Sequence, residues 1–124
     1  MIIVRMDSAF YNAAVTGAVR GGGARFSVTV PMNSSIRAAI AAISEDAWTP
    51  IRYPQAVWND QLDCWISYAE VAEVQYTAFA SKKGQAVTAR LIVRRVRDLN
   101  KKAGAGQDEL FPVWRYHAVF TDSP

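Results

Sequence analysis

The sequence has little of the chemistry that most small enzymes and metal sites use. Its 124 residues contain one cysteine, Cys64, and one histidine, His117. A single cysteine excludes a disulfide within the chain and any cysteine-rich zinc site, and it is typical of proteins from a reducing compartment. Cys64 and His117 could in principle pair as nucleophile and base, but one residue of each kind with no further signature is the background expectation for a chain of this length.

Long hydrophobic runs are also absent. The apolar start of the chain, residues 1–4, is too short for a secretory signal, and no run approaches the roughly 20 apolar residues of a spanning helix. Charged residues make up 20% of the chain and hydrophobic residues 51%, which excludes a disordered protein and favours one compact unit. We therefore expect a soluble, cytoplasmic protein that does not associate with membranes.

Positive charge is small in total but concentrated in one segment. The formal net charge is +3, whereas residues 82–102 alone carry eight basic residues and one acidic residue, a net +7. Such a cluster is what a polyanion recognises. The alternative is a solvated strand edge, where Lys and Arg prevent aggregation. The charge pattern alone favours neither interpretation.

The first strand and helix are predicted from residues 2–23. Residues 2–6 form a short apolar run that is typical of a strand buried on both faces. Asp7 and Ser8 are good N-cap residues and predict that a helix begins there, with the glycines at 21–23 ending it.

A second strand and helix follow. Residues 26–30 alternate apolar and polar side chains, as a strand does, and Asn33 or Ser34 is placed to cap a helix. The order strand, helix, strand, helix predicts an α/β layer with neighbouring parallel strands.

The remainder of the chain is predicted to be β-rich. Period-2 patterns dominate residues 64–79, 86–97 and 114–120, and the second of these has an apolar side and a basic side. We place a boundary near residue 50, which divides the chain into an α/β part, 1–50, and a β-rich part, 51–124. The predicted fold class is therefore α/β, or more broadly α+β.

Asp7 stands where a strand ends and a helix begins, and this is where ligands collect in α/β sheets. A carboxylate at such a position can bind Mg²⁺, which accepts few protein ligands and completes its coordination with water and phosphate oxygens. The alternative is that Asp7 only caps the helix.

Residues Arg5-Met6-Asp7-Ser8-Ala9-Phe10-Tyr11 resemble the segment around the second catalytic aspartate of bacterial insertion-sequence DDE transposases, in which a strand ends in Arg-x-Asp-Ser-x-Phe-Tyr. The resemblance continues in order along the chain, through residues 23–30, 51–54, 91–97 and 114–122.

This resemblance implies a partial ribonuclease H-like segment, residues 1–50, followed by an antiparallel β insertion and a return strand. It implies that Asp7 is catalytic and a ligand for Mg²⁺, in a family where three carboxylates hold two divalent ions that act on a DNA phosphodiester. The first aspartate and the final glutamate have no match in the sequence. Glu109 and Asp122 stand in the wrong context, so we expect an internal fragment that does not transpose DNA by itself.

The resemblance also implies DNA, the transposon ends, as the partner of the parent enzyme, and a location in the bacterial cytoplasm with the nucleoid. The basic segment supplies the expected DNA contacts: Lys82, Lys83, Arg90, Arg94, Arg95 and Arg97. An exposed sheet edge would also allow a homodimer. Two alternatives stay open, a non-catalytic DNA-binding or interaction module and a structural remnant without activity.

Overall fold

The fold is a mixed α+β arrangement built on one six-stranded sheet. The computed structural model describes residues 1–51, 58–59, 64–65, 69–82, 84–97 and 114–124. The strands of the large sheet are β1 (Ile3–Met6), β2 (Arg25–Val30), β3 (Thr49–Ile51), β6 (Ala69–Ala78), β7 (Val87–Arg97) and β8 (Trp114–Thr121). The two α-helices are α1 (Ala13–Gly21) and α2 (Ser34–Ala41), and short 3-10 turns lie at Ser8–Phe10 (η1) and Glu45–Ala47 (η2).

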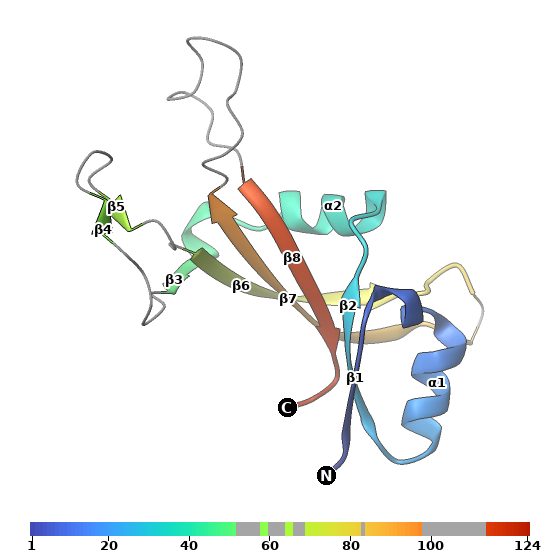
Figure 1. Ribbon diagram of the computed structural model, residues 1–124. Coiled ribbons are helices and arrows are strands. Elements are labelled where there is room, and N and C mark those ends of the chain that lie inside the picture. The colour runs from blue at the N-terminus through green and yellow to red at the C-terminus, as the bar shows by residue number, and fades with distance from the viewer. Residues whose placement is uncertain (52–57, 60–63, 66–68, 83, 98–113) are drawn as a thin grey trace.

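The strands follow the order β1-β2-β8-β7-β6-β3 (Figure 1). β1 and β2 are parallel neighbours joined through α1, which confirms the predicted parallel pair. Every other pairing in this sheet is antiparallel. A separate two-stranded pair, β4 (Trp58–Asn59) and β5 (Cys64–Trp65), lies outside the large sheet.

Because β2 pairs with β8, the segments before and after residue 50 share one sheet. The division near residue 50 into an α/β part and a β-rich part therefore stays a prediction from the sequence.

The first helix begins later than the sequence predicted. Asp7 caps only the turn η1, and α1 starts five residues further on, where the Asn12 side chain accepts a hydrogen bond from the Val15 N–H at 2.8 Å. Both Asp7 and Asn12 are good caps, so local preference did not distinguish them. The end of the helix is as predicted, because α1 stops at Gly21 and Gly23 adopts a φ of +81°.

The prediction that the first strand is buried on both faces is wrong. β1 is an edge strand with β2 as its one neighbour in the sheet, and its residues alternate between exposed and half-buried. Ile2 is 71% exposed and Ile3 40% exposed. A strand is buried on both faces only when chain segments cover both faces of its sheet, and among the described residues both helices pack on one face of this sheet.

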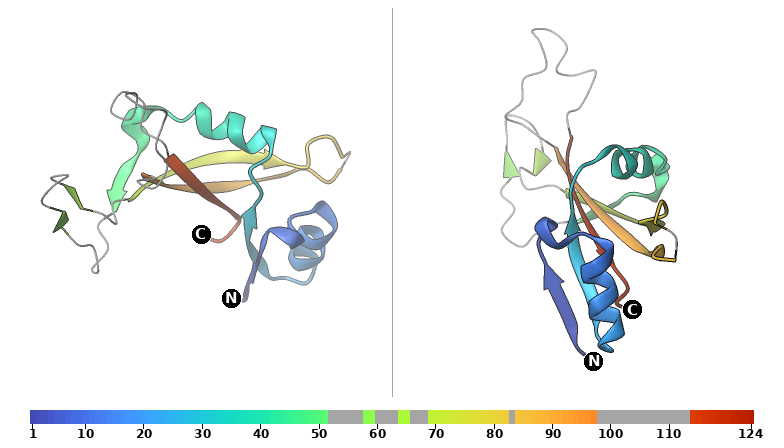
Figure 2. Two further views of the ribbon diagram at one scale, coloured as in Figure 1. Left: turned by 45° about the horizontal axis from the view of Figure 1, so that its top comes forward. Right: turned by 90° about the vertical axis from the view of Figure 1, so that its right-hand side faces the viewer.

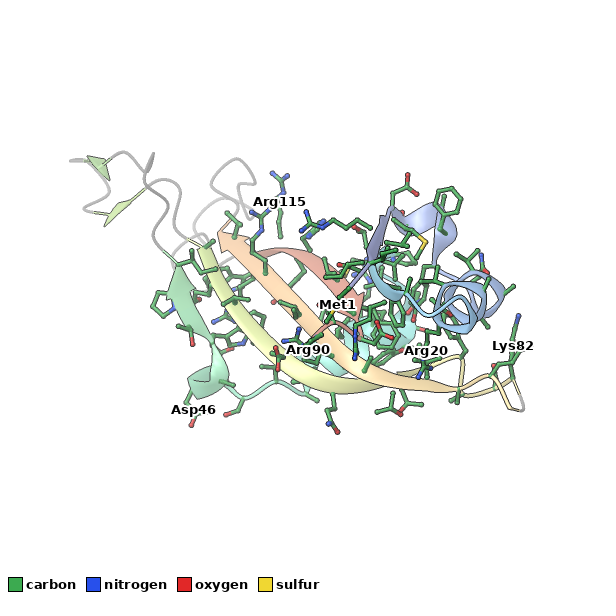
Figure 3. The ribbon with its side chains drawn as sticks, turned by 90° about the horizontal axis from the view of Figure 1, so that it is seen from below. Met1, Arg20, Asp46, Lys82, Arg90 and Arg115 are labelled. Carbon is green, nitrogen blue, oxygen red and sulfur yellow. The ribbon has the colours of Figure 1, made fainter. Side chains whose placement is uncertain are left out.

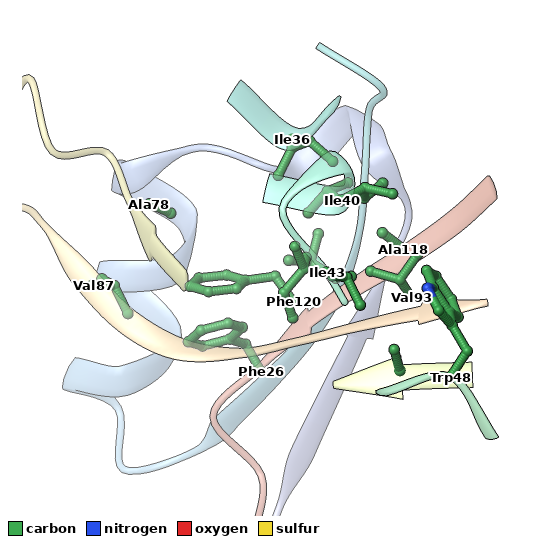
Figure 4. Close-up of a cluster of buried hydrophobic side chains, with 14 residues drawn as sticks. Phe26, Ile36, Ile40, Ile43, Trp48, Ala78, Val87, Val93, Ala118 and Phe120 are labelled. Carbon is green, nitrogen blue, oxygen red and sulfur yellow. The ribbon is translucent and has the colours of Figure 1, made fainter. Parts of the chain in front are cut away.

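The hydrophobic core lies between one face of the large sheet and the two helices. Phe26 and Phe120, on neighbouring strands, are fully buried with their ring centroids 5.4 Å apart (Figure 4). Ile36 and Ile40 of α2 pack into the same cluster, and Val19 of α1 packs against it. Figure 2 shows α1 beside β1 and β2, with α2 on the side of β7 and β8. Because side chains of both helices pack into this one cluster, both helices cover the same face of the sheet, which we call the core face.

The opposite face of the sheet, which we call the open face, carries no helix among the described residues. Side chains alternate along β7 as predicted, with Leu91 and Val93 fully buried on the core face and Ile92 half-buried on the open face. The antiparallel register carries this alternation to β6 and β8. No helix within the described ranges is long and apolar enough to cross a bilayer.

Candidate metal ligand and nucleic-acid interface

Asp7 directly follows β1, at the carboxyl end of the parallel β1–β2 pair, and the chain continues from it into the turn η1. Its Oδ1 accepts a hydrogen bond from the Ala9 N–H at 2.9 Å, and its side chain is exposed. The structure therefore shows the capping role, and it places the carboxylate in solvent, where an ion can also reach it. Capping uses Oδ1, and the described residues offer no hydrogen-bond partner to Oδ2.

A complete two-ion centre does not fit the residues around Asp7. Among the described residues no three His, Cys, Asp or Glu side chains come together in a way that holds a metal. Asp122 is committed elsewhere, because its Oδ1 accepts from the Phe26 N–H at 2.8 Å and its Oδ2 lies 3.5 Å from Nε of Arg20. Glu109 lies outside the described residues. Asp7 thus fits one ligand position of a Mg²⁺ site and no more.

The tyrosine of the same motif, Tyr11, is half-buried and packs against the hydrophobic core. The Tyr11 ring lies 5.0 Å from that of Phe79 and 6.3 Å from that of Phe120. Burial, reinforced by the neighbouring Tyr76 hydroxyl, raises the pKa of Tyr11 to about 12. Packing of this tyrosine holds the end of the segment that follows Asp7 against the core.

Two of the predicted DNA-contacting arginines, Arg90 and Arg94, lie on the open face. Arg90 is half-buried; its Nη1 donates to Oε1 of Glu73 at 2.7 Å, and its Nη2 donates to the backbone oxygen of Ser123 at 2.6 Å. Arg94 is exposed and lies opposite His117 of β8 in the register. Both arginines belong to β7, an inner strand of the large sheet.

Arg95 was predicted to contact DNA with its neighbours, but it points to the core face and is 5% exposed. Its guanidinium carbon lies 4.2 Å from the ring centroid of Trp48 and 4.3 Å from that of Trp114. Its donors reach two carboxylates, Glu70 at 2.9 Å and Glu45 at 2.9 Å. The strand alternation separates Arg94 from Arg95, so the basic run divides between two faces and Arg95 is not available to a phosphate.

The electrostatics of this cluster follow from its geometry. Burial alone lowers the pKa of the Arg95 guanidinium, but the hydrogen bonds and charges of Glu45 and Glu70 outweigh it and raise the pKa above its ordinary value. In return, the hydrogen bond from Arg95, together with its charge, lowers the pKa of Glu45. Arg95 thus ties η2 to the sheet between two indole rings.

The remaining predicted contacts are not brought to the same place. Lys82 is exposed in the turn that joins β6 to β7, at the far end of that hairpin from Arg115 (Figure 3). Lys83 and the side chain of Arg97 lie outside the described residues, and so does the side chain of Cys64, so the pairing of Cys64 with His117 is not described.

Four residues that the sequence analysis did not group with the basic strand join Arg90 and Arg94 on the open face. The pairing register places on this face Arg5 of β1, Arg25 of β2, and Arg115 and His117 of β8. All four are exposed. The period-2 pattern of each strand was readable from the sequence, but which strands lie side by side was not.

Neither a scan against models of protein families nor a search of curated proteins finds a match.

Proposed function

We propose that this chain is the middle part of a bacterial insertion-sequence DDE transposase, an enzyme that acts on DNA. The proposal rests on the resemblance of residues 5–11 to the segment around the second aspartate of the triad, and on the collinear segments that follow. The parallel pair β1–β2 and the later antiparallel strands are compatible with a partial ribonuclease H-like segment followed by a β insertion.

The observation that carries the proposal is the position of Asp7. Its exposed carboxylate stands at the carboxyl end of a parallel strand, the edge of an α/β sheet where ligand-binding groups gather. In the proposed role Asp7 supplies one carboxylate to a Mg²⁺ ion. Because among the described residues only this carboxylate fits a Mg²⁺ site, we expect no transposition from residues 1–124 alone.

Location and assembly follow from the same proposal. A transposase acts on chromosomal and element DNA, so we place the parent enzyme in the cytoplasm with the nucleoid. Among the described residues no strand pairs with the outer edge of β1, where Ile3 is 40% exposed, so this edge can accept a further strand, either from elsewhere in a longer protein or from a second copy in a homodimer.

The metal role is tested by paramagnetic broadening with Mn²⁺, which detects weak binding residue by residue. Substoichiometric Mn²⁺ is added to the ¹⁵N-labelled chain and amide peak heights are followed. The proposal expects preferential broadening of residues 7–9, and its loss in Asp7→Asn. Asparagine is as good an N-cap as aspartate, so this variant keeps η1 while removing the charge.

The matched control is Asp46→Asn, which removes another exposed aspartate, one that accepts a hydrogen bond from Ser44 at 2.5 Å. It should leave the broadening at residues 7–9 unchanged. Equal broadening around Asp7 and around Glu45–Asp46 would show a generic carboxylate effect and would reduce Asp7 to a cap.

A second candidate, a DNA-binding module without catalysis, is favoured by the arginines of the open face, where Glu73 is the one acidic side chain among the described strand residues. It predicts duplex binding that neither needs a divalent ion nor changes in Asp7→Asn. A structural remnant predicts no DNA binding and no preferential Mn²⁺ broadening.

A further inference from the structure

We propose that the open face of the large sheet is a binding surface for the phosphates of duplex DNA. The inference uses the DNA partner of the proposed function and assigns it a surface, without depending on the metal role of Asp7. The basic residues of this surface are Arg5, Arg25, Arg90, Arg94, Arg115 and His117.

Basic and acidic side chains are separated between the two faces of the sheet. The six groups come from four adjacent strands, β1, β2, β8 and β7, and the one acidic side chain on the same face of the described strands is Glu73, which is paired with Arg90. The acidic side chains Glu45 and Glu70 are paired with Arg95 of the core face instead. Segregation of this kind leaves one face with an excess of positive charge, which complements a polyanion.

The arginines at the margins of the open face are available to a ligand. Among the described residues, neither Arg5 nor Arg115 makes a hydrogen bond or ion pair from its side chain, and both are exposed. Arg25 is anchored through Nη1 to the backbone oxygen of Asp122 at 2.6 Å, and Arg90 to that of Ser123. These two arginines are oriented in advance, which lowers the entropy lost when they bind a ligand.

Basic residues of the open face lie in two rows across the sheet. Arg5 and Arg90 share one row across the sheet, through Ser27 and Thr121. Arg94 pairs with His117 in a second row, four residues further along β7. At about 3.3 Å per strand residue these rows are about 13 Å apart. That separation matches two phosphate strands flanking a major groove about 12 Å wide.

The face also favours a duplex over a single strand. Single-strand binders stack unpaired bases on aromatic rings. The open-face positions of the described strands carry no Phe, Tyr or Trp, because the rings of Trp114, Tyr116 and Phe120 belong to the core face. Phosphate contact without stacking is the mode of recognition that these side chains support.

The test is a fluorescence-anisotropy titration of a mixed-sequence duplex of about 20 base pairs, at about 50 and about 200 mM salt. The surface variant is Arg5→Ala with Arg115→Ala, which removes two exposed arginines whose side chains have no hydrogen-bond or ion-pair partner among the described residues, and it should not disturb folding. The matched control is Arg20→Ala with Arg37→Ala, which removes two exposed cations from the helices α1 and α2.

Each lost phosphate contact lowers the log–log salt slope by about 0.9, so the ratio of the two Kd values should fall about twelvefold in the surface variant. The control should keep the wild-type ratio, and Arg5→Lys with Arg115→Lys should largely restore it. An unchanged urea midpoint in each variant excludes misfolding as the cause.

Equal losses in the surface and control variants, or a loss in the control alone, would overturn the assignment of the surface while leaving DNA as the partner. Tighter binding of a single strand than of the duplex would overturn the duplex, and tighter binding of polyglutamate would overturn DNA. No binding of any of these by the wild-type chain would overturn the inference together with the DNA part of the proposed function, whereas the Mn²⁺ result at Asp7 would stand separately.

Discussion

Replacing Arg95 with alanine should destabilise the fold by about 3 kcal/mol. The substitution removes the one described cation paired with Glu70, whose side chain is 14% exposed, and it empties the space between Trp48 and Trp114. Removing one partner of a buried ion pair costs about 3–5 kcal/mol, because the other charge stays buried and unpaired. We take the lower end because Glu70 keeps some contact with water.

The second carboxylate of the cluster adds little to this figure. Glu45 is 83% exposed, so water readily replaces Arg95 around it after the substitution. The two indole contacts increase the loss, since a guanidinium over an aromatic ring contributes about 0.5–2 kcal/mol when desolvated. The value set by Glu70, about 3 kcal/mol, is therefore the lower end of the expected loss.

Urea unfolding followed by tryptophan fluorescence and circular dichroism measures the effect. With a slope of about 1.5 kcal/mol per molar urea, the midpoint should fall by about 2 M. The matched control is Arg94→Ala, which removes the neighbouring arginine on the open face. It should shift the free energy of unfolding by no more than about 0.5 kcal/mol.

A double variant isolates the unpaired charge as the cause. Arg95→Met with Glu70→Met removes both charges and keeps apolar volume, so it should recover most of the stability that Arg95→Ala loses. If Arg95→Ala costs less than about 1 kcal/mol, or no more than Arg94→Ala, then the cluster does not hold η2 to the sheet and the reasoning fails.

Two further predictions concern the same packing. Because Arg95 lowers the pKa of Glu45 below 4.5, the unfolded chain takes up the proton first as the pH falls; the contribution of Glu45 to stability is therefore complete above pH 4.5 and is lost below it. The difference in unfolding free energy between wild type and Glu45→Gln should be constant above pH 4.5 and shrink at lower pH, and a difference that grows on acidification would contradict this. Leu91→Ala, at a fully buried position, should cost about 3 kcal/mol in urea unfolding, whereas Ile92→Ala on the open face should cost clearly less; equal losses would refute the assignment of the two faces.

Features set by neighbouring residues were predictable from the sequence. The glycines at 21–23 end α1, Asn33 caps α2 by accepting from the Ile36 N–H at 2.9 Å, and the alternation of β7 gives one apolar side. Each of these depends on backbone conformation or side-chain period over a few residues, which local sequence determines.

Features set by distant residues were not predictable. The apolar pattern of β1 is that of a central strand, yet its place at the edge depends on which strands lie beside it. Arg95 looks like its neighbour Arg94, and its burial depends on Glu70 and Glu45, which are 25 and 50 residues away along the chain.

The candidate site divides in the same way. The position of Asp7 at the end of a strand follows from local pattern. The grouping of Arg5 and Arg115 with Arg90 depends on the order and register of β1, β2, β8 and β7. These cannot be predicted from a single sequence.

The central claim, that this chain belongs to a protein that handles DNA, is tested most directly by amide chemical-shift mapping with a short duplex at low salt. The account predicts perturbations on the open face, at Arg5, Arg25, Arg94 and His117, with α1 and α2 unaffected. Spectra that do not change on addition of the duplex, or changes confined to the two helices, would contradict it.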